Sequence, residues 1–162
     1  MPDAATDGDQ PPVGLVERLV ALQRVPGAGV LARQGLLLLG VDIPPSVRIG
    51  ADFRLQHRGR GVVLHPRTTI GDRVRIFHNV TVGRSEPHSL RPDDAIEQFV
   101  IADDAWLCVG AVVLGSRGVV RVGEGTVVAA NAVLTRSTGD FEIWAGSPAR
   151  KVADRTEPLR NR

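Results

Sequence analysis

The side chains of this sequence best suited to acid–base or nucleophilic chemistry are four histidines and one cysteine. They are His57, His65, His78, His88 and Cys108. A neutral imidazole can take the proton of an alcohol as the alcohol attacks an acyl group, and a neighbouring carboxylate can orient the ring and stabilise the imidazolium. A single cysteine cannot form an internal disulfide, so we expect a protein of the reducing cytoplasm.

The elements that position these residues follow a period of six. From Ile43 onward, an aliphatic residue recurs at every sixth position between interruptions. These aliphatic positions are Ile43, Ile49, Leu55, Leu64, Ile70, Ile76, Val82, Ile101, Leu107, Val113, Val122, Val128 and Leu134. Four positions after most of them stands a small or β-branched residue. Neither helix periodicity nor strand alternation gives this pattern, which predicts a triangular parallel β-solenoid with three hexapeptides in each turn.

The rest of the chain divides around this repeat. Residues 13–40 carry leucines at helical spacing (Leu15, Leu19 and Leu22, then Leu36 and Leu39), and Pro26 and two glycines split them into two helices. We expect their apolar face to cap the open end of a β-helix domain at 41–152. Residues 1–12 are predicted to be a disordered tail, 153–162 a loose charged tail, and 84–98 a long polar loop; shorter insertions surround 58–61 and 117–119.

The repeat brings several candidate residues together. Asp42 precedes the inward Ile43, and His57 lies two positions beyond the inward Leu55, so both belong to the first coil. A hydrogen bond between Asp42 and His57 is therefore expected. His78 lies two positions beyond Ile76 and 21 positions after His57. That spacing predicts that the two histidines stack on neighbouring coils, roughly 5 Å apart.

Several stretches resemble the serine acetyltransferases and the related sugar acetyltransferases. The stretches are Asp42–Gly50 with Leu55-Gln56-His57, then Ile70–Ile76 with Asn79–Gly83, Ile101–Gly115, Val122–Leu134 and Ala145–Arg150. The resemblance covers about two thirds of the chain. It implies a left-handed parallel β-helix, mainly β with a short N-terminal helical cap. It also implies an acetyl-CoA-dependent O-acetyltransferase that transfers an acetyl group to a small hydroxyl acceptor, and a homotrimer.

The resemblance assigns roles on the acceptor side. His57 takes the place of the catalytic histidine and Asp42 that of its carboxylate partner. Gln56 stands where serine acetyltransferases carry an acceptor-binding Asp, which argues against a free amino acid as acceptor. His78 is a candidate for lining the acceptor site. In the long polar loop, His88 or Arg91 would correspond to the family's acceptor-binding Arg-His pair.

The resemblance also implies how the other substrate binds. The family holds CoA in a groove between neighbouring subunits. Backbone amides of the coils contact the pantetheine arm, and basic residues near the end of the domain contact the phosphates. The matching residues are Val109, Gly110, Ala130 and Asn131 for the arm, and Arg150 and Lys151 for the phosphates. The family's large N-terminal helical domain has no counterpart in these 162 residues, which argues against a hexamer and a complex with a cysteine synthase.

Other functions fit less well. A sugar O- or N-acyltransferase of polysaccharide or natural-product biosynthesis would use the same His57 chemistry, and a noncatalytic trimeric scaffold would share the fold. A γ-type carbonic anhydrase needs zinc ligands that include two histidines five positions apart, which this sequence lacks, so we expect no metal. The net charge is only +2, and the arginines are interleaved with acidic residues, so no nucleic-acid partner is expected. The longest apolar stretch, 30–41, is too short to span a membrane.

Overall fold

The computed structural model describes residues 14–86 and 96–156, and shows a mainly β protein with two short helices before the strands. The helices are α1 (Leu15–Leu22) and α2 (Gly29–Leu38). One parallel sheet contains β1 (Arg48–Ile49), β4 (Thr68–Ile70), β7 (Ile96–Ile101) and β10 (Gly118–Val122). A second contains β3 (Val63–Leu64), β6 (Thr81–Arg84), β9 (Val112–Gly115) and β12 (Val133–Leu134). The third contains β2 (Arg54–Leu55), β5 (Arg75–Ile76), β8 (Trp106–Leu107), β11 (Val127–Val128), β13 (Glu142–Gly146) and β14 (Ala149–Asp154). We name the sheets by their first strands.

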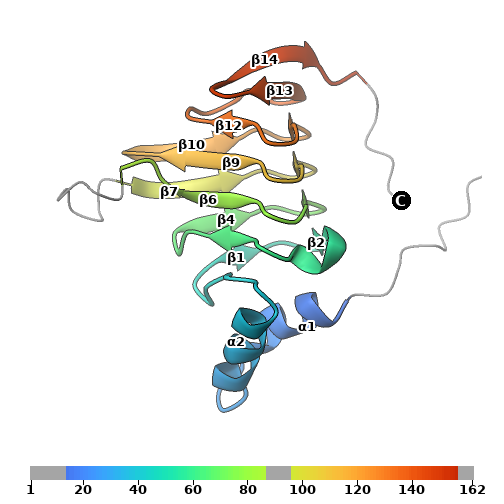
Figure 1. Ribbon diagram of the computed structural model, residues 1–162, viewed down its shortest axis with the longest axis vertical. Helices are drawn as coiled ribbons and strands as arrows, with labels where there is room; N and C mark the ends of the chain where they lie inside the picture. The colour runs from blue at the N-terminus through green and yellow to red at the C-terminus, as the bar shows by residue number, and fades with distance from the viewer. Residues whose placement is uncertain (1–13, 87–95, 157–162) are drawn as a thin grey trace, which may run out of the picture.

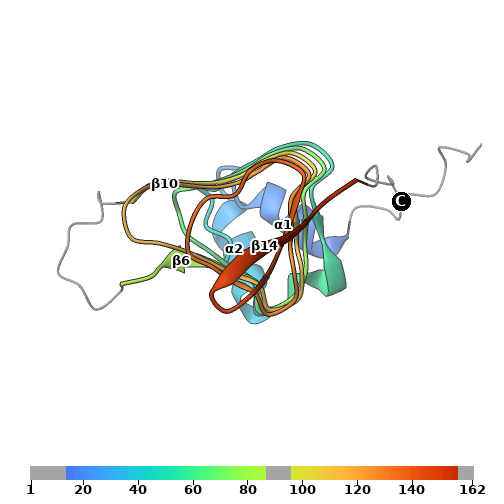
Figure 2. The same cartoon turned by 90° about the horizontal axis from the view of Figure 1, so that it is seen from above.

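Successive strands visit the β1, β2 and β3 sheets in rotation, so each circuit of the chain forms one coil stacked on the coil before it (Figure 1). Seen from above, the coils superpose on one roughly triangular outline (Figure 2). The parallel pairing keeps inward residues in line: Leu55 pairs with Ile76, and Ile76 with Leu107. Each coil thereby satisfies the backbone groups of its neighbours and buries their aliphatic side chains.

The core is a single cluster of aliphatic residues inside the coils. The residues predicted to point inward are all buried, except Ile49, which packs half-buried against the cluster. Two further large side chains of the core come from β7: Ile96 lies off the six-residue pattern, and Phe99 stands in register with Thr68, where the repeat carries a small or β-branched residue. Packing therefore follows the repeat through most of the coils and departs from it in the side chains of β7, which with β10 is longer than β1 and β4 of the same sheet.

The two helices lie at the end of the first coil (Figure 1). Of the leucines expected on their buried face, Leu36 is buried in the core and Leu19 packs half-buried against it, but the face as a whole differs from the expectation. Val16, Val20 and Leu36 join the core, whereas Leu15 is 66% exposed and Leu39 is 40% exposed. Two overlapping apolar stripes run along α1, and the valine stripe is the one that fits against the aliphatic residues of the first coil.

Polar side chains of α1 and the α1–α2 turn also bond to the edge of the first coil. Glu17 Oε1 accepts a hydrogen bond of 3.0 Å from the Leu55 amide, and Gln23 Nε2 donates one of 2.9 Å to the Ile43 carbonyl. These contacts satisfy backbone groups that have no further coil below them. Neither helix is long and apolar enough to cross a membrane.

At the other end, β14 turns back antiparallel to β13 and closes the β2 sheet. Two expected boundaries change accordingly. β14 continues through Asp154, so the expected tail at 153–162 begins later, and β6 and β7 take up Arg84 and 96–98 from the expected loop at 84–98. The expected disordered tail, 1–12, lies outside the described residues.

Candidate active site

His57 lies at the corner between the β2 and β3 sheets, in a short turn of 3-10 helix over Gln56–Gly59. Its backbone is left-handed, with φ of 54°, and that of Arg58 is too, with φ of 63°. Left-handed residues also mark this corner in the next three coils, at Asn79, Gly110 and Asn131. The extra residues of the first coil therefore bulge outward at the corner and carry the His57 ring with them, so that it is exposed.

The two corner histidines touch, as their 21-residue spacing predicts. The ring centroids of His57 and His78 are 5.0 Å apart and the rings are nearly perpendicular, at 86°. Phe77 lies beside them, 6.3 Å from His57 between ring centroids. Nδ1 of His78 is buried and has no hydrogen-bond partner among the described residues. The pair thus presents one exposed imidazole, His57, supported from the next coil by a more enclosed one.

The corner continues as a column up the coils. Gly110 donates a 3.1 Å hydrogen bond to the His78 carbonyl, and Asn131 donates one of 2.9 Å to the Val109 carbonyl. Of the residues expected at the CoA site, Val109, Gly110, Ala130 and Asn131 therefore follow His78 along one edge of the molecule.

The two basic residues expected at the far end differ in their surroundings. Arg150 is exposed and pairs in register with Ala145, the residue after Trp144 at the upper end of the column. Lys151 Nζ instead lies 3.0 Å from Glu142 and 2.6 Å from Asp154. These two carboxylates raise the pKa of Lys151 and partly neutralise its charge. Arg150 is the better placed of the two for a phosphate.

The expected hydrogen bond between Asp42 and His57 is not among those of the described residues. Asp42 Oδ1 instead accepts from Arg33 Nη2, which reaches it from α2. Asp42 itself sits on the β3 sheet, bridged to Val63. The spacing of the repeat placed Asp42 in the correct coil, but its partner comes from the helical cap, which the repeat does not describe.

A pocket of about 860 Å³ opens beside His57, between the helical cap and the start of the β2 sheet. Its lining includes His57 and Gln56, with apolar side chains from α1, the end of α2 and β2. The described charged residues that line it are Glu17, Arg54, Arg58, Arg60 and Arg75. The pocket is large enough for a ligand of drug size and has one reactive imidazole at its wall.

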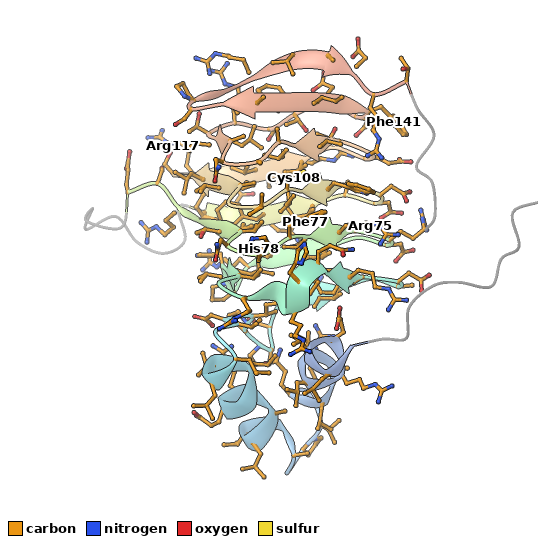
Figure 3. All side chains as sticks on the ribbon, turned by 45° about the vertical axis from the view of Figure 1, so that its right-hand side comes forward. Arg75, Phe77, His78, Cys108, Arg117 and Phe141 are labelled. Carbon is orange, nitrogen blue, oxygen red and sulfur yellow. The ribbon has the colours of Figure 1, made fainter. Side chains whose placement is uncertain are left out.

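Two of these arginines lie in register on the outer face of the β2 sheet, Arg54 on β2 and Arg75 on β5. Burial lowers the pKa of the Arg75 guanidinium, and repulsion from Arg54 lowers it further. One strand further, the Trp106 ring lies between two guanidinium groups, 5.7 Å from that of Arg75 and 5.2 Å from that of Arg155. Figure 3 shows Arg75, Phe77, His78 and Cys108 on neighbouring coils of one side of the molecule.

The remaining candidates are less central. Burial raises the pKa of the Cys108 thiol, which favours a packing role over that of a nucleophile. The His65 ring packs 5.3 Å from Phe99, and its Nδ1 accepts a hydrogen bond from the Arg67 amide, a structural role. His88 and Arg91 lie outside the described residues. Within 14–86 and 96–156, no group of three or more His, Cys, Asp or Glu side chains could hold a metal ion.

Sequence reasoning missed the arginines of the pocket and Arg33. A signal for the first was present, because Arg54 and Arg75 are separated by the same 21 positions as His57 and His78. Residues so spaced occupy equivalent positions on consecutive coils. Arg33 carried no such signal, since it belongs to a helix whose docking the repeat does not determine.

The three-sheet coil is shared with solved acetyltransferases. The chain matches the crystal structure of serine acetyltransferase from Brucella abortus in complex with coenzyme A, with a TM-score of 0.68 and 25% identity, over 86% of this chain and 54% of that one. It is 32% identical over 133 residues to the serine acetyltransferase of Bacillus subtilis, covering 82% of this chain and 57% of the relative. It is 33% identical over 147 residues to serine acetyltransferase 4 of Arabidopsis thaliana, covering 82% and 38%. No protein-family model matches the chain.

These similarities define the chain first as a protein of the acetyltransferase class built on stacked parallel coils. More narrowly, it belongs to the serine acetyltransferase-like family. It spans only 57% and 38% of the length of the two relatives named above.

Proposed function

We propose that this protein is an acetyl-CoA-dependent O-acetyltransferase, serine O-acetyltransferase-like, that works as a left-handed parallel β-helix with His57 as general base. The observation that supports this most directly is the position of His57. Its exposed ring stands where the pocket below it meets the corner column above it. A base in that place can reach a hydroxyl in the pocket and a thioester at the foot of the column.

In the proposed reaction, neutral His57 takes the proton of the acceptor hydroxyl while the oxygen attacks the thioester carbonyl. The tetrahedral intermediate collapses, the carbon–sulfur bond breaks, and the CoA thiolate leaves. The thiolate takes the proton from the imidazolium, which restores His57. The acetyl group passes directly between the substrates, so no acyl-enzyme forms.

Asp42 would act on this base through its surroundings. Arg33 binds one oxygen of the Asp42 carboxylate. The second oxygen would accept a hydrogen bond from the imidazolium that forms on His57. The pair thus links α2 to the first coil. We assign Asp42 and Arg33 positioning roles, with the proton transfer itself left to His57.

For acetyl-CoA, the corner column gives a continuous edge over several coils and ends near Arg150. We propose that the pantetheine arm follows Val109, Gly110, Ala130 and Asn131, with the phosphates near Arg150. We also propose a homotrimer, in which a neighbouring copy completes the groove. Flat faces of a three-sided coil suit cyclic symmetry, and light scattering should give the mass of three chains.

The Ala130→Trp variant tests this route. Ala130 is exposed at the corner, so an indole there fills the proposed track without disturbing the core. We expect the KM for acetyl-CoA to rise roughly 10-fold or more, since ground-state and transition-state binding are lost together. Glu124→Trp places the same bulk on an exposed residue of the same coil at another corner, and should leave KM unchanged. Equal effects of the two variants would remove the corner column from the CoA site.

The function itself is tested by thiol release from acetyl-CoA, measured with the full chain and a panel of hydroxyl acceptors that includes L-serine and simple sugars. Acceptor-dependent thiol release establishes acetyl transfer. Its absence with every acceptor would favour a noncatalytic trimeric scaffold. A sugar acyltransferase remains the second candidate, because a pocket of about 860 Å³ is much larger than a free amino acid needs.

A further inference from the structure

The charge of the pocket beside His57 indicates which class of acceptor it can bind. Among its described lining residues, four arginines stand against one carboxylate, Glu17. Glu17 already accepts a hydrogen bond from the Leu55 amide at the coil edge. The pocket is therefore strongly positive next to the proposed base, although the chain as a whole carries a net charge of only +2.

The positions of Arg54 and Arg75 also indicate an anionic ligand. The two residues are paired in register on neighbouring parallel strands, and like charges placed directly opposite one another destabilise a sheet. Their mutual repulsion also contributes to the lowered pKa of Arg75. Two arginines on neighbouring strands can offer their guanidinium groups to the two oxygens of a carboxylate or phosphate.

Apolar side chains complete the lining. Leu15, Leu38 and Leu39 come from the helical cap and are exposed, and Leu55 comes from β2. A ligand that fills this space has an anionic group toward the β2 sheet and a less polar body against the helices. An ammonium group would be repelled, so a zwitterionic free amino acid is a poor fit.

Resting on the acetyl transfer proposed above, we propose that the acceptor is an anionic alcohol larger than a free amino acid. Its carboxylate or phosphate is bound by Arg54 and Arg75, and its hydroxyl is presented to His57. Arg58 and Arg60, both exposed on the turn that carries His57, add to the positive potential at the mouth of the pocket.

The test uses methyl pyranosides that differ mainly in charge: methyl glucoside, methyl glucuronide, methyl glucosaminide and methyl glucoside 6-phosphate. Binding to the full chain in the presence of CoA is measured by calorimetry, and thiol release from acetyl-CoA is measured in parallel. We expect the glucuronide or the phosphate, or both, to bind at least roughly 10-fold more tightly than the neutral glucoside, and the cationic glucosaminide to bind weakest. The two anions separate carboxylate from phosphate recognition.

The double variant R54Q/R75Q should lose the preference for anions by roughly 10- to 100-fold and leave binding of the neutral glucoside unchanged. Thermal unfolding of R54Q/R75Q checks that the variant still folds. R48Q is the matched control: Arg48 is an exposed arginine on β1 of the same coil, outside the pocket lining, and its loss should change nothing.

Four outcomes decide the matter. Equal binding of neutral and anionic pyranosides, or an anion preference that survives R54Q/R75Q, overturns the inference and leaves acetyl transfer standing. Anion binding that depends on the two arginines, with no thiol release from any acceptor, supports the anion site and contradicts the proposed activity. Tighter binding of the cationic glucosaminide also overturns the inference.

Discussion

Replacing His57 with alanine is expected to lower kcat for acetyl transfer by roughly 10²–10⁴-fold, the usual effect of removing a general base. The fold should survive, because the ring is exposed at the corner and contributes nothing to the core. Binding of CoA should survive too, since the proposed track begins two coils above His57, at Val109 and Gly110. The measurement is steady-state thiol release, with calorimetric titration of CoA into the same variant.

Two further histidine variants test whether His57 itself is the base. His65→Ala is the control, because His65 packs on Phe99 away from the pocket and should leave kcat nearly unchanged. His78→Ala should have an intermediate effect, since His78 supports the ring of His57 at 5.0 Å. Loss of turnover in His78→Ala with near-normal turnover in His57→Ala would transfer the role of base to His78. Full activity in both would end the acyltransferase proposal.

The Phe99→Ala variant is expected to lower the free energy of unfolding by about 3–5 kcal/mol, the range for deleting a fully buried ring. Phe99 is completely enclosed in the core, at the middle strand position where β7 pairs with both β4 and β10. The cavity would sit between coils that relax little, because each is held by hydrogen bonds to its neighbours. Denaturant unfolding at a fixed protein concentration measures the change.

Phe141→Ala is the matched control for that truncation. Phe141 is 44% exposed, so the same change should cost well under half as much. A comparable loss in both variants would mean that the β7 region is packed more loosely than the structure shows.

The coil could be predicted from sequence because its period is a direct consequence of its geometry. A residue such as Ile76 must be aliphatic, since it is stacked between Leu55 and Leu107 inside the prism. The same logic placed His78 on His57, because residues 21 positions apart occupy equivalent places on the first two coils. The resemblance to acetyltransferases then supplied roles that periodicity alone could not.

The six-residue period could not predict the features that form where the chain departs from the repeat. The partner of Asp42 is Arg33, which comes from a helix, and the orientation of that helix depends on which of two apolar stripes docks. Phe99 stands in register with Thr68, at the repeat position that carries small or β-branched residues, so the period predicts a buried side chain there but not an aromatic ring. The pocket likewise forms between the helical cap and the β2 sheet, so neither the helical spacing nor the six-residue period predicts it.

The bonds from the helical cap to the first coil also determine how copies of this molecule can meet. A stack of parallel strands is a template that another chain can extend, unless its last backbone groups are already occupied. Glu17 and Gln23 occupy such groups at Leu55 and Ile43. At the opposite end, the antiparallel β14 lies across the growing edge of the β2 sheet. Growth into a fibre along the coil axis is thereby opposed at both ends, and association is directed to the flat sides, where a small closed ring is possible.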